Sequence, residues 1–172
     1  MLTAGCGGQT KAGSASSNGQ ARSTSPAKQS QPAAPQPSAR HYSPYETAMQ
    51  ALGDRLALVM EESGMTVRSQ GATRGVIVRA LRVAQHQLQL SAIALAKLTP
   101  PARIKVLHRR LLTGVRRFAA ELDAVIVSAK SGTDGIRIAA TIPTLPGLKE
   151  MQRASDAIVK AGYAIVLHVH SG

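Results

Sequence analysis

The sequence is poor in cysteine and in aromatic residues. It contains one cysteine, Cys6, no tryptophan and one phenylalanine, Phe118. A single cysteine excludes an internal disulfide. Because small and aliphatic residues supply most of the apolar content, the core must be aliphatic and its elements must approach closely, which favours helices packed on helices. No apolar run reaches the roughly 18 residues that a membrane-spanning helix needs.

Catalytic motifs are missing as well. The sequence has no phosphate-binding loop and no Gly-x-Ser-x-Gly motif, which would present a serine nucleophile on a sharp turn. Glu61 and Glu62 are neighbours at a predicted helix end and point apart. Glu121 forms an ordinary i, i+4 surface pair with Arg117. We therefore expect no enzyme, no metal site and no cofactor.

Acidic residues are absent from a long central stretch. No Asp or Glu occurs between Glu62 and Glu121, and the net charge of the whole chain is +12. The basic residues of this stretch are Arg68, Arg74, Arg79, Arg82, Lys97, Arg103, Lys105, Arg109, Arg110, Arg116 and Arg117. Solvated arginines on a helical surface are one interpretation. A one-sided excess of charge favours an anionic partner, because like charges one helical turn apart repel.

The position of Cys6 is informative. It follows Leu2-Thr3-Ala4-Gly5, and residues 9–40, "QTKAGSASSNGQARSTSPAKQSQPAAPQPSAR", contain no Ile, Leu, Val or aromatic residue. Such a segment buries too little apolar surface to offset the cost of ordering, so residues 1–42 are predicted to be a disordered Pro/Ser/Ala-rich tether.

The "LTAGC" stretch resembles a bacterial lipobox, in which the cysteine is lipidated and becomes the mature N-terminus. The resemblance implies a lipid anchor on Cys6 and a place on the cell membrane or in the extracytoplasmic cell envelope. Only five residues precede Cys6, and a signal peptide needs a charged start and an apolar stretch, so we expect translation to begin further upstream. The alternative is a cytosolic protein with one exposed thiol.

Residues 43–172 are predicted to form an all-α domain, an antiparallel four-helix bundle. Ser43, Pro44 and Glu46 form a capping box with proline at the first helical position, and Gly64 is the expected stop of the first helix. The second helix should run from about Thr73 to Leu98. Thr99 is the expected N-cap of the third, with both following prolines in its first turn.

The third and fourth helices are predicted from apolar stripes at helical spacing. The third extends to about Lys130 and carries Leu107, Leu111 and Val115. The fourth runs from about Leu145 to Ala161, with Gly162 as its C-terminal cap. The stretch between them, "IRIAATIPTLPG", is interpreted as a short helical turn or an irregular linker.

Two stretches carry a further resemblance. "ALAKLTPPARIKVLHRRLLTGVRRFAAELD" (residues 94–123) resembles the helical hairpin of small actinobacterial-type lipoproteins, and "AIVKAGY" (residues 157–163) is similar to the end of their last helix. The resemblance implies the envelope setting and the bundle. It brings no activity with it.

The histidines do not form a convincing site. His108 lies at the edge of the third helix's apolar stripe, where a packed residue is expected, and His86 is predicted to be solvated. His168 and His170 would share a face on a strand and could begin a zinc site. No third ligand lies near them in the sequence, so we interpret them as incidental to an apolar C-terminal extension.

The strongest candidate for binding is a basic ridge on the third helix, away from its apolar stripe. We define the basic ridge as Arg103, Lys105, Arg109, Arg110, Arg116 and Arg117. An anionic lipid surface is the favoured partner, since each basic residue near it contributes about 1 kcal/mol. An acidic cell-wall polymer is a further candidate. The rival is non-specific nucleic-acid binding, which the shortage of stacking aromatics and the lack of a recognition-helix motif disfavour.

Overall fold

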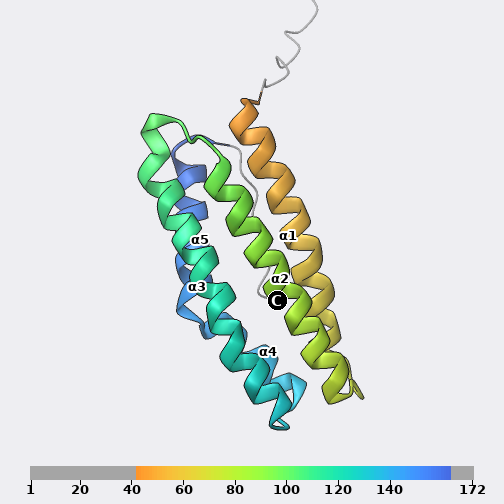
Figure 1. Ribbon diagram of the computed structural model, residues 1–172. Helices are drawn as coiled ribbons and strands as arrows, with labels where there is room; N and C mark the ends of the chain where they lie inside the picture. Colours follow the sequence, from red (N-terminus) through yellow and green to blue (C-terminus); the bar gives the residue numbers. More distant parts are fainter. Residues whose placement is uncertain (1–41, 164–172) are drawn as a thin grey trace, which may run out of the picture. The chain divides into compact units, whose positions relative to one another are not determined.

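The computed structural model describes residues 42–163, in which helices are joined by short connections and no β-strand is present (Figure 1). The chain divides into two units, Met1–Ala39 and Arg40–Gly172, and the described residues belong to the second. The five α-helices within residues 42–163 are α1 (Pro44–Arg68), α2 (Arg74–Lys97), α3 (Lys105–Lys130), α4 (Gly135–Thr141) and α5 (Pro146–Lys160). Two short 3-10 helices, η1 (Ala102–Ile104) and η2 (Ile142–Thr144), precede α3 and α5.

The all-helical prediction is confirmed, with one helix more than the four expected. The additional helix, α4, together with η2 occupies the stretch for which a short helical turn or linker is predicted. Asp134 caps α4, because its carboxylate accepts from the amide of Arg137 at 2.9 Å. The connection between α3 and α4 is therefore short, since α4 starts at Gly135.

α1 begins as predicted and ends later than predicted. The Ser43 hydroxyl accepts from the amide of Glu46 at 3.2 Å, and the Glu46 carboxylate accepts from the amide of Ser43 at 2.9 Å. The prediction that Gly64 stops the helix is wrong, since α1 continues to Arg68. A glycine inside a helix costs only about 1 kcal/mol relative to alanine. That cost is small beside the burial of Val67, which is 2% exposed.

α2 matches its prediction, but the connection to α3 does not. Thr73 caps α2, with its hydroxyl 3.4 Å from the amide of Val76. Pro100 and Pro101 lie outside any helix, so the prediction that Thr99 caps α3 is wrong. A residue that precedes proline is held away from the helical region of backbone space. Both Thr99 and Pro100 precede a proline, and helical structure therefore starts only at Ala102.

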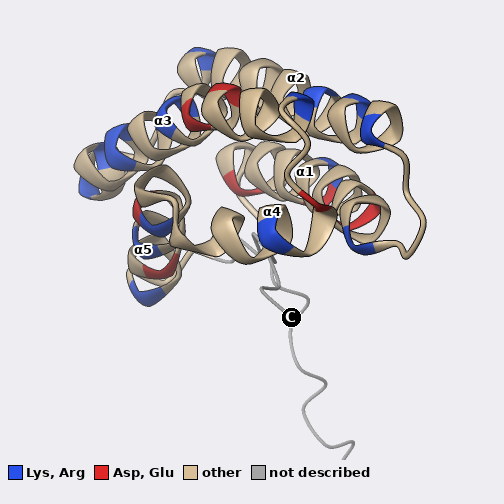
Figure 2. Ribbon diagram, turned by 90° about the horizontal axis from the view of Figure 1, so that it is seen from below, with Lys and Arg blue, Asp and Glu red and all other residues tan. Residues whose placement is uncertain are grey.

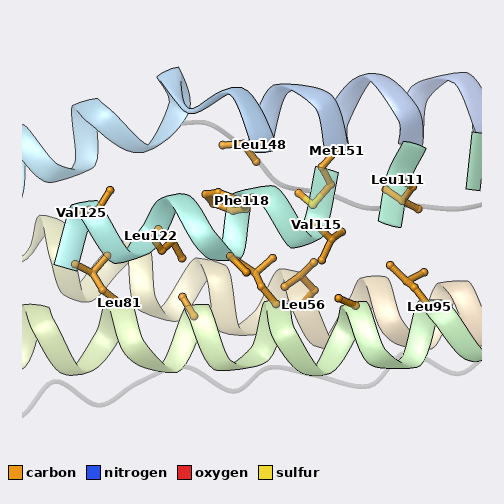
Figure 3. Packing of buried hydrophobic residues seen from close by; sticks show 14 of the residues in the cluster. Leu56, Leu81, Leu95, Leu111, Val115, Phe118, Leu122, Val125, Leu148 and Met151 are labelled. Carbon is orange, nitrogen blue, oxygen red and sulfur yellow. The ribbon is translucent and has the colours of Figure 1, made fainter. Parts of the chain in front are cut away.

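The core is aliphatic and surrounds the single phenylalanine. Leu88, Leu111 and Phe118 are 0% exposed, and Figure 3 shows the apolar side chains of α2, α3 and α5 pointing toward one another. Burial of each such side chain contributes roughly 1.5–3 kcal/mol. α3 packs against both α2 and α5 and so lies at the centre of the domain.

α3 and α5 approach so closely that only glycine fits between them. A Cβ atom on Gly114 of α3 would lie 2.6 Å from the backbone nitrogen of Met151. A Cβ atom on Gly147 of α5 would overlap the backbone of Phe118. The two contacts pair residue 114 with 151 and residue 118 with 147, so α3 and α5 run antiparallel with their backbones touching.

Candidate functional site

All six residues of the basic ridge are exposed in the structure. The ridge is, however, two rows rather than one. Consecutive helical residues are about 100° apart around the axis, so Arg109 and Arg110 point in different directions, as do Arg116 and Arg117. We call Lys105, Arg109 and Arg116 the outer row, and Arg110 and Arg117 the groove row. Arg103 lies just before α3, in η1.

The groove row lines a groove between α3 and α5. The α3–α5 groove has a volume of about 520 Å³. Its cationic lining is Arg110 and Arg117 from α3 and Lys149 and Arg153 from α5, and its only carboxylate among the described residues is that of Glu150. The remaining lining residues are Leu107, Thr144, Pro146, Ala154 and Ala157. Two helices that are separate in sequence thus bring four positive charges to one hollow, and Figure 2 shows basic segments on both helices.

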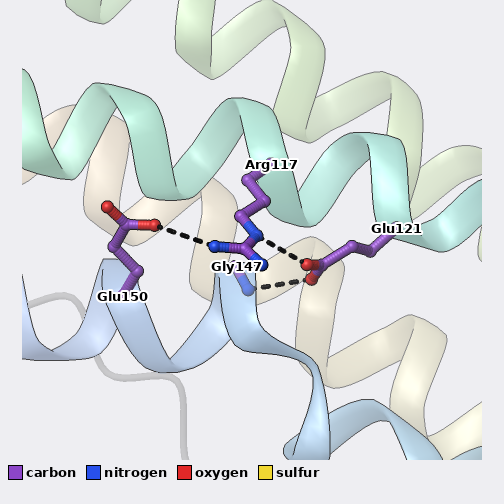
Figure 4. Close-up of polar contacts among 4 residues, drawn as sticks. All are labelled: Arg117, Glu121, Gly147 and Glu150. Atoms are coloured by element: carbon purple, nitrogen blue, oxygen red, sulfur yellow. Dashed lines mark hydrogen bonds and ion pairs between the residues drawn. The ribbon is translucent and has the colours of Figure 1, made fainter.

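One end of the groove is held by a small polar network, drawn in Figure 4. Arg117 donates from Nε to Glu121 at 2.9 Å, and its Nη1 lies 3.8 Å from the carboxylate of Glu150. The second oxygen of Glu121 accepts from the amide of Gly147 at 2.8 Å. Leu145, at the N-cap position of α5, provides no side-chain cap. Glu121 of α3 therefore supplies the capping acceptor that α5 lacks, where a negative charge also favours the helix dipole.

The outer row lies roughly 100° around α3 from the groove row, on the flank nearer α2. Asp123 follows Arg116 by seven residues, which places both on the same side of α3. Gln85 of α2 donates from its amide nitrogen to the Asp123 carboxylate at 2.8 Å and to the Ala119 carbonyl at 2.9 Å. No carboxylate of the described residues forms an ion pair with the outer row, because those pairs involve only Arg117 and Arg137. The outer row therefore presents unneutralised charge.

His108 is a packed residue, as the sequence predicts, and it links three helices. Its Nε2 donates to the Leu95 carbonyl of α2 at 3.1 Å, and its Nδ1 accepts from the hydroxyl of Tyr45 of α1 at 2.9 Å. The carbonyl can only accept, so the neutral ring must carry its proton on Nε2. Burial lowers the pKa of His108, opposed by the hydrogen bond to Leu95. Burial, with Tyr163 nearby, raises the pKa of Tyr45 to about 12.

Several predicted features lie outside the described residues. These are Cys6, most of the tether predicted for residues 1–42, His168 and His170. Within residues 42–163, no group of three or more His, Cys, Asp or Glu is placed to hold a metal ion. None of the helices in this range combines the length and apolar character needed to cross a membrane. His86 is exposed, as expected.

Sequence reasoning missed Lys149 and Arg153 as members of the site. Both are exposed and lie one helical turn apart on α5, on the side away from its buried Leu148 and Met151. The i, i+4 spacing of two cations beside an apolar stripe was the available signal. Their pairing with the groove row depends on how α5 packs on α3, which the local pattern does not contain.

No protein-family model, curated protein or solved structure matches this chain. The function that we propose therefore rests on the chain's own sequence and on the charge and geometry of its surface.

Proposed function

We propose that this chain is a non-enzymatic lipoprotein of the bacterial cell envelope, anchored through Cys6, whose basic ridge binds an anionic membrane surface or wall polymer. The proposal includes the finer architecture expected from the sequence, an antiparallel bundle of the four long helices behind a flexible tether of residues 1–42. A tether of this length lets the domain reach the surface to which Cys6 is attached.

The observation that carries the binding role is the segregation of charge. The chain has no acidic residue from position 63 to position 120, and every residue of the basic ridge within that range is exposed. Only Arg117 among them has a carboxylate partner within residues 42–163. A surface on which several free cations repel one another gains free energy when an anionic surface approaches, and each contributes about 1 kcal/mol.

The lipid anchor is tested by mass spectrometry of the protein purified from a bacterial membrane fraction. We expect an N-terminus at Cys6 carrying acyl chains, because two chains give stable anchoring where one gives only marginal binding. An intact N-terminus with an unmodified thiol would overturn the anchor and leave the cytosolic alternative.

The surface binding is tested separately, with a Cys6→Ala chain that cannot be acylated. We expect it to co-sediment with phosphatidylglycerol vesicles, and not with phosphatidylcholine vesicles, and to be released by salt. The double substitution Arg109→Ala/Arg116→Ala should weaken vesicle binding by up to roughly thirtyfold, from about 1 kcal/mol per cation.

The matched control carries the same change in charge elsewhere. Arg55→Ala/Arg137→Ala removes two cations that have acidic neighbours, since Arg55 follows Asp54 and Arg137 lies 3.4 Å from Asp134. This control should bind nearly as well as the parent chain. Equal losses for the two double variants would contradict a localised binding face. Tighter, salt-dependent binding to duplex DNA than to the vesicles would favour the nucleic-acid alternative.

A further inference from the structure

The positive charge of the α3–α5 groove is largely uncompensated. Four cationic side chains line it, and the two carboxylates of the described residues that form ion pairs with them, those of Glu121 and Glu150, both pair with Arg117. Among the described residues, no carboxylate pairs with Arg110, Lys149 or Arg153. Like charges brought together by two helices destabilise their packing. An anion seated between them would convert this repulsion into attraction.

Four cations from two helices line one groove, which suits an anion seated between the helices better than a flat surface does. Lys149 and Arg153 are about 6 Å apart along α5, and Arg110 and Arg117 about 10 Å apart along α3. Arginine presents a planar fork of donors that matches the oxygens of a phosphate, and lysine adds a point charge. The groove therefore offers donors from two sides to a group with several oxygens.

The groove also has an apolar part that a bare inorganic anion would leave unfilled. Leu107 on α3 and Pro146, Ala154 and Ala157 on α5 line it together with the cations. Its volume of about 520 Å³ falls in the range of small-molecule sites, and its lining combines five charged residues with four apolar ones. A ligand that fills it combines an anionic head with an aliphatic portion.

We propose that the α3–α5 groove binds the phosphate head group of an anionic amphiphile, with the phosphate between Arg110, Lys149 and Arg153 and the adjoining aliphatic part against Leu107 and Ala157. This deepens the proposed function and rests on it, because it assigns a specific lipid-type ligand to the domain's basic surface. The outer row remains a separate, less selective contact.

Glu150 allows the proposal to be tested by a substitution that should raise the affinity for an anion, and not only by substitutions that should lower it. Its carboxylate lies 3.8 Å from Arg117, a distance at which an exposed pair contributes little to stability. Glu150 is the one acidic residue among those that line the groove, and its carboxylate repels an anion there. Neutralising it by Glu150→Gln should tighten phosphate binding, which a purely structural role for the groove does not predict.

The test uses the full-length Cys6→Ala chain and monomeric dihexanoyl phosphatidylglycerol, below its micelle concentration, in a calorimetric titration. Lys149→Ala/Arg153→Ala should lower the affinity about tenfold, a moderate value for two charged contacts open to solvent. Arg109→Ala/Arg116→Ala, with the same change in charge on the outer row, should change it less than about twofold. Glu150→Gln should raise the affinity about threefold, whereas Glu62→Gln on α1 should leave it unchanged.

Two further probes identify the source of the affinity. Inorganic phosphate should bind more weakly than phosphatidylglycerol, because it leaves the apolar part empty, and dihexanoyl phosphatidylcholine should bind more weakly because its head group is neutral overall. Equal binding of inorganic phosphate and phosphatidylglycerol would overturn the amphiphile. Equal effects of the two double variants, or no titratable binding, would overturn the groove.

The failure of this inference differs from the failure of the proposed function. If the groove is not a site, the parent chain still binds phosphatidylglycerol vesicles and loses that binding through Arg109 and Arg116. If the proposed function fails, the vesicles are not bound although the monomeric lipid titrates into the groove. Circular dichroism of each variant shows that the fold is retained.

Discussion

α3 meets α5 partly backbone to backbone, at two glycines, whereas it meets α2 through side chains. On the α5 side, Gly114 and Gly147 let two backbones touch, and the cleft beside them carries four cations. On the α2 side, the contact is made by apolar residues such as Leu81 and Leu95 (Figure 3) and by the hydrogen bonds of His108 and Gln85.

The difference explains how α3 can take part in a close backbone contact and also line the charged α3–α5 groove. No side chain separates the backbones at residues 114 and 147. The long side chains on either side of this contact therefore line the α3–α5 groove. On the α2 side, packed leucines fill the interface. Substitutions on the two sides should therefore differ in how much they lower the free energy of unfolding. The expected losses range from several kcal/mol to a fraction of 1 kcal/mol.

The α5 side should tolerate no Cβ atom at its closest contact. Gly147→Ala would place a Cβ atom in the backbone of Phe118 and should lower the free energy of unfolding by about 3 kcal/mol, because a backbone cannot yield as a side chain can. Urea denaturation followed by circular dichroism measures the change.

Gly75→Ala is the matched control for this substitution. Gly75 is also the second residue of its helix, α2, and a Cβ atom there would have no other atom within 4 Å. The change should be neutral or stabilising by less than about 1 kcal/mol. Similar losses from both glycine substitutions would refute the close contact between α3 and α5.

The α2 side should depend on the neutral form of His108. His108→Ala removes the acceptor of the buried Tyr45 hydroxyl and the donor to Leu95. It should lower the free energy of unfolding by about 2 kcal/mol at pH 7.5, measured by the same urea denaturation.

The same residue should give the protein a pH-dependent stability. Burial holds the pKa of His108 below its ordinary value of 6.5, so the unfolded chain binds more protons than the folded one between the two pKa values. The free energy of unfolding should therefore fall as the pH is lowered through 6.5 toward the folded-state pKa. Thermal unfolding between pH 7.5 and 5.5 measures this slope, which His108→Ala should reduce and His86→Gln, at an exposed position, should preserve. An unchanged slope in His108→Ala would assign it to other groups.

The polar cap of α5 should contribute less than either packing effect. Glu121→Ala removes the acceptor of the Gly147 amide and the close partner of Arg117, and it should cost about 1 kcal/mol, as the loss of a helix cap does. Glu121→Gln keeps an acceptor oxygen and should cost less. Amide hydrogen exchange at Gly147 should accelerate only in the Glu121 variants.

Asp123→Ala is the control for the cap, because it removes the corresponding carboxylate on the α2 side. It should change stability by less than about 0.5 kcal/mol, since its partner Gln85 bonds Ala119 as well. If Asp123→Ala lowered the free energy of unfolding as much as Glu121→Ala does, the effect of Glu121→Ala could not be assigned to the cap of α5.

Features set by neighbouring residues were predictable from the sequence. The capping box of Ser43 and Glu46, the start of α2 after Thr73 and the apolar stripe of α3 depend on contacts within one or two turns, and all are present in the structure. The positive φ of 93° at Gly162, just beyond α5, agrees with its predicted role as a cap.

Features set by packing were not predictable in this way. Gly64 carries a local signal to stop, but α1 continues because the following turn buries Val67. The cap of α5 comes from Glu121, 26 residues before Gly147. The groove depends on which faces of α3 and α5 meet. The charge of the site could be predicted from the sequence, whereas its shape could be known only from the folded structure.

The glycine contact also fixes the register of α5 on α3. A slide of one turn would drive the side chains of Glu150 or Met151 into the α3 backbone. α5 can therefore pack on α3 in one register only. Arg117 adjoins one contact point, and Lys149 and Arg153 each lie two residues from Met151 at the other. The backbone positions that carry these charges are consequently set when the domain folds, so the anion that we propose would not bear the entropic cost of bringing the two helices together.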